Sequence, residues 1–338
     1  MQEKPEIQEK IILTCLWEEY GLAVDRLEFL PWGADVNTAV YRAVANGKTD
    51  YFIKLRKGDF SEISVSLPHF LNANGIQAVI PPLETRDHRL WVNLEPFRLI
   101  LQPYVEGRNG YEVQPSTAQW IEFGQALKQI HSLSLPAALV SRIPSETFSS
   151  AWREMVLDFL QQVEVKQFSE PTSAKLAVFM KEHGAVIRRI VMRANQLGEW
   201  ISSRPLKFVL CHSDIHPGNL LICPDNQIYI VDWDSPILAP PERDLQLIGG
   251  CPTWNQPDEI TSFRLGYGDS KPDPTLLAYY RYERVIQDMA AFCQQILLTG
   301  TGGKDRQQGY QYFCSNFLPG HEIDLAHEVD RLSGRKQP

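Results

Sequence analysis

The spacing of hydrophobic residues changes along the chain from a strand-rich pattern to a helical one. Near the N-terminus, residues 6–20 repeat their apolar side chains close to every 3.6 residues, which predicts an amphipathic helix. A further helix is predicted over 59–73, and short apolar runs typical of strands lie at 27–30, 40–45, 48–55, 89–94 and 98–102. Asn46-Gly47 stands between two of these runs and favours a two-residue hairpin turn. This part of the chain therefore predicts a small antiparallel sheet with helices.

The later part of the chain is mainly helical in pattern. Helical periodicity is present at 116–132, 149–165, 172–200 and 274–298, and is interrupted by an apolar, strand-rich segment at 208–234. Residues 105–110 contain two glycines and are typical of a linker. We expect an α+β protein with an antiparallel β-lobe at 1–102, a hinge at 103–110 and a larger, mainly helical lobe at 111–338. A cleft between two such lobes is a preferred position for a ligand.

The charge balance narrows the class of ligand. The 338 residues include 33 Lys and Arg against 41 Asp and Glu, for a net charge of −8. Such a chain lacks the basic surface of a nucleic-acid-binding protein and suits a cationic small molecule better. No apolar run is long enough to span a membrane, the charged N-terminus has no signal-peptide core, and the six cysteines form no C-x-x-C pair. We therefore expect a cytoplasmic protein without a nucleic-acid or membrane partner, present as a monomer or a weak homodimer.

The segment 211–234 carries the strongest candidate chemistry. Two apolar runs flank the turn sequence Pro-Asp-Asn-Gln at 224–227. A hairpin with this four-residue loop places Asn219 opposite Asp232, with Cβ atoms about 4.5–5.5 Å apart. One amide oxygen and one carboxylate suit Mg²⁺, which prefers oxygen ligands. Asp214 precedes Asn219 by five residues, and it is placed to accept the proton of a hydroxyl group or to orient that group.

Two other interpretations of this segment remain open. Its Asp, Pro, Gly and Asn residues are also typical of an ordinary turn, with His212 as a buried core residue. Alternatively, His212, Asp214 and His216 have the spacing of metal ligands in a hydrolase, although no second His/Asp cluster in the sequence completes such a site. The combined spacing of Asp214, Asn219 and Asp232 favours phosphoryl transfer.

Phosphoryl transfer requires a cation beside the nucleotide phosphates, and Lys54 is the candidate. It alternates with apolar neighbours on the 48–55 strand, and the two-residue turn places it opposite Ala39, next to the loop 33–38. That loop has a single glycine, Gly33, and offers Asn37 and Thr38 as further donors to phosphate. The alternative is an ordinary lysine that faces solvent.

Glu62 has two candidate roles at the start of the 59–73 helix. It is spaced either to pair with Lys54 beside the nucleotide or to form a capping box with Asp59. Pro68 removes a helix hydrogen bond and should kink this helix. The sequence leaves both roles of Glu62 open.

The chain that closes the first lobe has the features of an adenine-binding hinge. An adenine ring can bind one backbone carbonyl and one backbone N–H that lie two residues apart. The Gln102 carbonyl and the Tyr104 N–H fit this pattern, since the proline between them has no N–H. These two groups are the candidate adenine contacts.

Together, these residues resemble the aminoglycoside phosphotransferase family, which shares the protein-kinase-like fold. The family pattern H-x-D-x-x-x-x-N is present from His212 to Asn219, and Asp232 matches the second metal-binding aspartate. The stretches V-D-W-D-S-P-I-L-A-P-P-E-R-D-L and Y-Y-R-Y-E-R-V-I-Q-D are most similar to spectinomycin phosphotransferases. The resemblance implies ATP and Mg²⁺ as cofactors, with Asp214 at the acceptor hydroxyl, Asn219 and Asp232 on the metal, and Lys54 on the phosphates.

The implied activity is transfer of the γ-phosphoryl group of ATP to a hydroxyl of an aminocyclitol antibiotic, with spectinomycin as the expected acceptor. The family pattern is not specific for substrate, so a kinase of choline, methylthioribose, homoserine or fructosamine is the alternative. A pseudokinase-like binding module is a third interpretation. The intact Lys54, Asp214, Asn219 and Asp232 argue against it.

An excess of acidic residues indicates where a cationic acceptor binds. Between 205 and 290 the sequence has twelve Asp and Glu against six Lys and Arg, which should focus a negative potential. Asp234 and Glu283 have no assigned metal in this region, so they are the expected substrate contacts. The expected apolar walls of the substrate site are Trp233, Trp254 and Tyr279. A solvated acidic face is the alternative explanation.

Overall fold

The computed structural model describes residues 4–32, 37–268, 271–300 and 303–334 of the chain. The chain divides into two compact units. The first comprises 1–144, 214–236 and 265–268, and the second comprises 145–213, 237–264 and 269–338. This division groups the 214–236 segment with the N-terminal sheet, whereas the sequence-based boundary at 103–110 separates the two.

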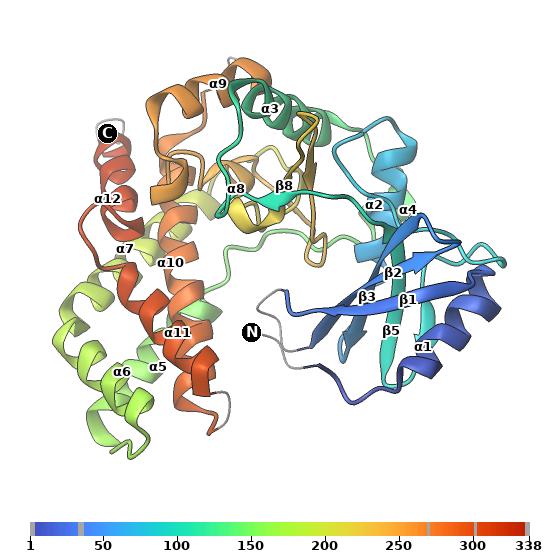
Figure 1. Cartoon of the computed structure of the whole chain (residues 1–338). Coiled ribbons are helices and arrows are strands. Elements are labelled where there is room, and N and C mark those ends of the chain that lie inside the picture. The colour runs from blue at the N-terminus through green and yellow to red at the C-terminus, as the bar shows by residue number, and fades with distance from the viewer. Residues whose placement is uncertain (1–3, 33–36, 269–270, 301–302, 335–338) are drawn as a thin grey trace. The chain divides into compact units, whose positions relative to one another are not determined.

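A five-stranded antiparallel sheet forms the centre of the first unit (Figure 1). Its spatial order is β1-β2-β3-β5-β4. The strands are β1 (Val24–Leu30), β2 (Thr38–Ala45), β3 (Thr49–Lys57), β4 (Val92–Leu94) and β5 (Phe97–Pro103). Each of the five predicted apolar runs overlaps one of these strands, so the predicted antiparallel sheet is confirmed.

One face of this sheet is covered by the N-terminal helix. Helix α1 (Glu9–Cys15) continues as the π-helical turn η1 (Leu16–Tyr20), in agreement with the predicted helix. Ile12 and Leu16 are fully buried and belong to one core cluster with alternate residues of the strands, among them Tyr41, Ile53 and Leu99. Because side chains alternate across a strand, the residues between these positions face the opposite side of the sheet.

The β2–β3 hairpin differs by one residue from the prediction. Asn46 and Gly47 both have positive φ angles, of 53° and 67°, but the loop also takes in Lys48, because Ala45 pairs with Thr49. Lys54 therefore lies opposite Val40, and the predicted pairing with Ala39 is wrong. This register places Lys54 on the sheet face opposite the α1 core.

A second, three-stranded sheet in the first unit holds the predicted hairpin. Its order is β6-β8-β9, formed by β6 (Arg108–Asn109), β8 (Leu220–Ile222) and β9 (Ile228–Ile230), so part of the predicted linker is a strand. The remaining elements of this unit are α2 (Ile63–Ala73), α3 (Thr117–Ser132), α4 (Ala137–Val140) and the 3₁₀ turn η2 (Pro217–Asn219). Ser116 and Gln119 form a capping box at the start of α3, and the Gln119 amide also donates to the Cys223 carbonyl at 3.0 Å. The N-terminus of α3 is thereby attached to the hairpin loop.

The second unit is mainly helical, as predicted. Helix α10 (Pro274–Leu297) provides much of its core, including Ile286, Met289 and Cys293, which are fully buried. The predicted helix over 172–200 is two helices, α6 (Pro171–Glu182) and α7 (Gly184–Ser202). The other elements are α5 (Ala151–Val165), β7 (Val209–Cys211), β10 (Ile237–Ala239), α8 (Glu242–Leu245), η3 (Pro252–Trp254), α11 (Gly303–Ser315) and α12 (Glu322–Ser333), while α9 (Pro257–Tyr267) contributes to both units.

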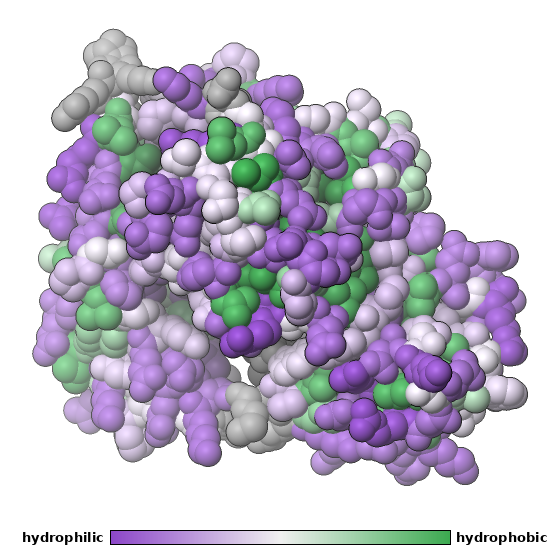
Figure 2. All heavy atoms as spheres, turned by 45° about the horizontal axis from the view of Figure 1, so that its top comes forward, coloured by the Kyte–Doolittle hydropathy of each residue, from purple (hydrophilic) through white to green (hydrophobic). Residues whose placement is uncertain are grey.

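One face of the molecule is mostly polar. Figure 2 shows a face on which hydrophilic side chains predominate, with hydrophobic side chains between them in small groups. Among the helices in the described part of the chain, none is both long and apolar enough to cross a bilayer.

Two residues expected to contact substrate lie instead inside the second unit. Glu283 is 3% exposed and Tyr279 is 1% exposed, so neither offers surface to a ligand. The Glu283 carboxylate faces the guanidinium of Arg153, with Nε and Oε2 3.6 Å apart. Burial raises the pKa of Glu283 to about 7, although the positive charges of Arg153 and Arg243 oppose the rise. The acidic excess of the sequence is therefore partly internal.

This raised pKa makes the stability of the fold depend on pH. The folded state holds the Glu283 proton more tightly than the unfolded chain, so the contribution of Glu283 to stability is fully present below about pH 4.5 and is lost as pH rises through 7. The fall amounts to at most roughly 3 kcal/mol. Urea unfolding between pH 5 and 8 measures how the free energy of unfolding changes with pH. In Glu283→Gln this change should be smaller than in wild type, because the contribution of Glu283 is absent. The control is Glu164→Gln, at an exposed position of α5. Equal pH slopes in wild type and Glu283→Gln would contradict the assignment.

Candidate active site

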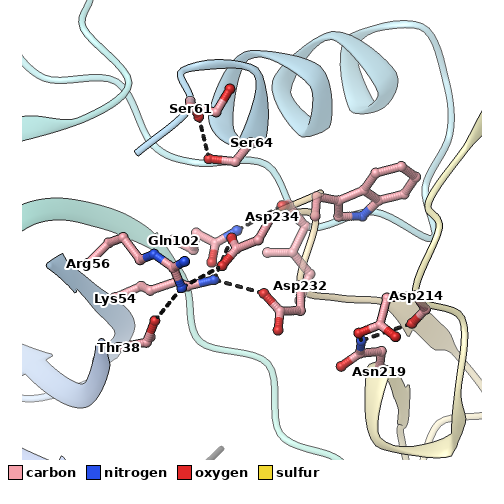
Figure 3. A network of polar contacts seen from close by, with 12 residues as sticks. Thr38, Lys54, Arg56, Ser61, Ser64, Gln102, Asp214, Asn219, Asp232 and Asp234 are labelled. Carbon is pink, nitrogen blue, oxygen red and sulfur yellow. Dashed lines mark hydrogen bonds and ion pairs between the residues drawn. The ribbon is translucent and has the colours of Figure 1, made fainter. Parts of the chain in front are cut away.

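Lys54 forms the central ion pairs of the candidate site. Its Nζ lies 2.8 Å from Oδ1 of Asp232 and 2.7 Å from Oδ1 of Asp234 (Figure 3). The lysine comes from β3, and the two carboxylates follow β9, so the contacts connect the five-stranded sheet to the hairpin within the first unit. Burial by itself would lower the pKa of the Lys54 ammonium, but the two carboxylates outweigh burial and raise it. The lysine is therefore held in its charged form.

Arg56 is a site residue that the sequence analysis missed. It lies two residues after Lys54 and therefore on the same face of β3. Its Nη1 donates to Oγ1 of Thr38 at 2.9 Å and to Oδ2 of Asp234 at 3.2 Å (Figure 3). Thr38 is also its cross-strand partner on β2. The available signal was the spacing of two cations in the strand sequence K-L-R.

A small cavity of about 30 Å³ lies beside these charged groups. Lys54, Arg56 and Asp234 contribute to its lining, together with Asp59, Phe60, Ser61, Ser64 and Ile100. Ser61 precedes α2 and Ser64 lies in its first turn, and the Ser64 hydroxyl donates to the Ser61 carbonyl at 2.7 Å. A cavity of this size accommodates about one water molecule.

Glu62 occupies neither of its two predicted positions. Its carboxylate pairs with Nη2 of Arg142 at 3.0 Å, and its side chain is 60% exposed. It is the N-cap residue of α2 but makes no side-chain capping bond, so the predicted capping box with Asp59 is also absent. Pro68 is accommodated inside α2. The carboxylates that pair with Lys54 thus come from the segment after β9, and the predicted Glu62–Lys54 pair is wrong.

The hairpin register also corrects the predicted metal pair. Leu220 pairs with Ile230, and the Val231 N–H donates to the Asn219 carbonyl at 3.0 Å, so Val231 is the residue opposite Asn219. The loop is one residue shorter than predicted, because the pair formed by Cys223 and Gln227 closes it and leaves residues 224–226 as the loop. Asp232 follows the strand with a φ of 66° and directs its carboxylate to Lys54. The left-handed backbone at Asp232, rather than strand pairing, sets its direction.

Asp214 and Asn219 are in direct contact. The Asn219 amide nitrogen donates to the Asp214 carbonyl at 3.0 Å and to Oδ2 of its carboxylate at 3.2 Å (Figure 3). Nε2 of His216 lies 3.5 Å from the same oxygen, and Nδ1 of that ring accepts from the Gly218 N–H at 3.0 Å. The Asp214 side chain is 42% exposed. It is therefore oriented by its neighbours and still accessible to a ligand.

The backbone before Asp214 is fixed by a buried carboxylate that sequence reasoning did not single out. Asp244, fully buried in the second unit, accepts the N–H groups of His212 and Ser213 at 2.8 and 2.7 Å. Ser213 has a φ of 75°, a strained value for a residue with a side chain. The two charge-assisted hydrogen bonds stabilise this unusual turn.

The donor groups fit a hard divalent cation. The Asp232 side chain is 49% exposed and offers carboxylate oxygens. Asn219 directs its amide nitrogen to Asp214, which leaves its oxygen as the atom that can meet a cation. Carboxylate and amide oxygens are ligands of Mg²⁺, which usually keeps several water molecules in its shell.

One of the two predicted adenine contacts is already occupied by a hydrogen bond within the protein. The Tyr104 N–H already donates to the Asp50 carbonyl at 3.2 Å, so in this structure it is not available to adenine. The Gln102 side chain donates to the Ile80 carbonyl at 3.0 Å, and its backbone lies opposite Phe52. The prediction for the Gln102 carbonyl stands as a prediction.

The remaining predicted residues fall into three groups. Gly33 lies outside the described residues. Asn37 and Thr38 lie at the start of β2, where the Asn37 carbonyl accepts the Lys57 N–H at 2.8 Å. Trp233 is 4% exposed and Trp254 is fully buried, so the expected apolar walls are covered by protein.

Comparison with known proteins identifies the family. Residues 31–280 match the model of the phosphotransferase enzyme family. The chain belongs to this family. The resemblance noted in the sequence and the predicted kinase-like α+β fold are thereby confirmed.

Individual relatives give the same result. The chain is 35% identical to a spectinomycin phosphotransferase solved with ADP and spectinomycin, with a TM-score of 0.90 over 97% of this chain and 100% of the other. An AMP-bound structure of spectinomycin phosphotransferase matches with a TM-score of 0.85 and 35% identity, over 94% and 98% of the two chains. Protein StrN of Streptomyces griseus is 27% identical over 254 residues, which cover 71% of this chain and 75% of StrN.

The position of Glu62 leads to a test of the corrected ion pair. An exposed pair such as Glu62–Arg142 contributes little, so Glu62→Gln should leave phosphotransferase turnover within about twofold of wild type. Lys54→Met, which removes the ammonium group that pairs with Asp232 and Asp234, should lose most turnover under the same conditions. A loss in Glu62→Gln comparable to that in Lys54→Met would show that Glu62 acts on the site after all.

Proposed function

We propose that the protein is an ATP-dependent O-phosphotransferase that acts on a hydroxyl group of an aminocyclitol antibiotic, with spectinomycin as its acceptor. The observation that carries this proposal is the match along nearly the whole chain to a spectinomycin phosphotransferase in complex with ADP and spectinomycin. The Lys54–Asp232 ion pair and the Asp214 carboxylate held by Asn219 supply the groups that phosphoryl transfer requires.

The nucleotide side of the site is built from β3 and the segment after β9. Lys54 binds the phosphates of ATP as a compact, charged donor. Asp232 and Asn219 hold Mg²⁺ through their oxygens. Bound Mg²⁺ supplies positive charge that offsets the charge of the phosphate oxygens. Because Lys54 and Asp232 pair with each other in this structure, both must turn partly toward the ligand when it binds.

Asp214 acts on the acceptor. Its carboxylate accepts a hydrogen bond from the reacting hydroxyl and orients it toward the γ-phosphorus atom. It takes the hydroxyl proton as the new O–P bond forms, while the bond from the γ-phosphorus to the bridging oxygen breaks and ADP leaves. The Asn219 amide holds one carboxylate oxygen, so the group keeps a fixed direction. Phosphoryl transfer depends mainly on such positioning and on electrostatic stabilisation.

A substrate panel tests the proposal. The purified protein is incubated with Mg²⁺ and ATP, and ADP formation is measured with spectinomycin, choline, methylthioribose, homoserine or a fructosamine as acceptor. Spectinomycin should stimulate ADP formation far above the rate without acceptor, and mass spectrometry should find the monophosphorylated antibiotic. Stimulation by another member of the panel, with none by spectinomycin, would replace the proposed acceptor.

Substitution of Asp214 tests its role in the reaction. Asp214→Asn should bind nucleotide like wild type but turn over about 10²–10⁴-fold more slowly, because the carboxylate that takes the proton is gone. Initial rates and ADP affinity by calorimetry measure the two effects separately. Near-normal turnover in this variant would remove Asp214 from the mechanism.

Substitution of each of the two metal-binding candidates should raise the Mg²⁺ requirement of the reaction by a different amount. Asp232→Ala removes a full negative charge, whereas Asn219→Ala removes a neutral oxygen, so the first should raise the Mg²⁺ concentration for half-maximal rate more than the second. Titration of Mg²⁺ at saturating ATP measures this difference. A wild-type Mg²⁺ dependence in both variants would exclude these residues as metal ligands.

A further inference from the structure

The two carboxylates on Lys54 are held differently. Asp232 is 49% exposed and lies two residues after the end of β9. Asp234 is 31% exposed and bridges two cations, with Oδ1 on Lys54 and Oδ2 on Arg56 (Figure 3). A carboxylate held through both oxygens has less freedom to turn toward another partner than one that is half exposed.

Arg56 is itself fixed in place. Its backbone is part of β3 between β2 and β5, and its guanidinium donates to the Thr38 hydroxyl as well as to Asp234. The rigid guanidinium makes directed hydrogen bonds, in contrast to the flexible lysine ammonium. Arg56 therefore fixes the position of Asp234 relative to the strand that carries Lys54.

The charges of the cluster indicate separate roles for the carboxylates. Lys54 and Arg56 carry two positive charges, and Asp232 and Asp234 carry two negative charges. Under the proposed function Asp232 would turn to Mg²⁺. Lys54 would then lose one of the two carboxylates that balance its positive charge. A long lysine side chain without a fixed partner samples many rotamers, which weakens its grip on phosphate. The start of α2 does not replace this partner, because Glu62 pairs with Arg142.

We propose that Asp234 is the positioning residue of Lys54, and that Arg56 holds Asp234 in place for this role. Asp234 keeps the ammonium directed at the phosphates while Asp232 binds the metal. This assignment moves Asp234 from the substrate contacts expected from the sequence to the nucleotide side of the site. It rests on the proposed function for the role of Lys54, but not on the identity of the acceptor.

A double-mutant cycle tests the proposal. Affinity for ADP with Mg²⁺ is measured by calorimetry for wild type, Asp234→Asn, Lys54→Met and the double variant. Asp234→Asn should weaken binding by roughly tenfold, the usual effect of losing a hydrogen bond to a charged group. In the Lys54→Met background the same substitution should change affinity by less than about twofold, because a positioning residue has no effect without its target. An equal effect of Asp234→Asn in both backgrounds would overturn the proposal.

Further readouts separate this role from two others. If Asp234 binds Mg²⁺, Asp234→Asn should shift the Mg²⁺ titration even in the Lys54→Met background. If it binds the acceptor, the KM for spectinomycin should rise while the KM for ATP stays constant. The proposal predicts a fall in kcat and a rise in the KM for ATP, with the acceptor KM unchanged. Either of the other two patterns would contradict it.

Conservative and control variants show whether the effect on ADP binding comes from the carboxylate of Asp234 and its contact with Arg56. Asp234→Glu keeps the charge and should recover part of the loss seen in Asp234→Asn. Arg56→Met should weaken ADP binding in the same direction as Asp234→Asn and add little to it when the two are combined. Asp87→Asn, at a carboxylate that is 81% exposed, is the control and should bind ADP like wild type. Thermal unfolding of every variant identifies those that fail to fold.

The binding measurement is independent of the acceptor. If the protein binds ADP but phosphorylates no member of the panel, the proposed function fails while the cycle still reports the coupling between Asp234 and Lys54. If spectinomycin is phosphorylated and the two substitutions act independently, the proposed function stands and the positioning role of Asp234 is wrong.

Discussion

The charge of Lys54 has to be compensated within the first unit, and the arrangement of the site follows from this requirement. Its side chain is 14% exposed, and a shielded ammonium is costly unless carboxylates are close and well oriented. Asp232 and Asp234 provide this compensation from a segment 178 and 180 residues further along the chain. The same contacts attach the hairpin that carries Asn219 to the five-stranded sheet, so the electrostatic requirement also places the loop of Asp214 and Asn219.

The arrangement also explains how the site can be charged and still open to ligands. Asp232, with its left-handed backbone and half-exposed carboxylate, is the member able to exchange Lys54 for a cation. Asp214 is held by the Asn219 amide and yet remains 42% exposed. Each group is thus oriented by protein contacts on one side and accessible on the other, which is the geometry that positioning and electrostatic stabilisation require.

The sequence predicted the elements of the fold better than their register. Apolar periodicity located the five strands and the long helices, and the spacing from Asp214 to Asn219 pointed to two residues that the structure brings into contact. Loop lengths were each wrong by one residue, because the apolar pattern does not show that Lys48 belongs to one loop and that a Cys223–Gln227 pair closes the other. Counting charges could not show that Glu283 is buried against Arg153, or that Glu62 pairs with Arg142 while Asp234 pairs with Lys54. Those facts depend on the tertiary packing of residues distant in sequence.

The most direct measurement is a crystal structure of the protein with Mg²⁺ and a non-hydrolysable ATP analogue. Lys54 should lie within hydrogen-bond distance of a phosphate oxygen and of Asp234, with Asp232 and Asn219 at the metal and Arg56 still bound to Asp234. A structure in which Lys54 leaves Asp234 for another carboxylate such as Glu62, or in which Lys54 and Asp232 remain paired away from the bound nucleotide, would contradict this account of the site.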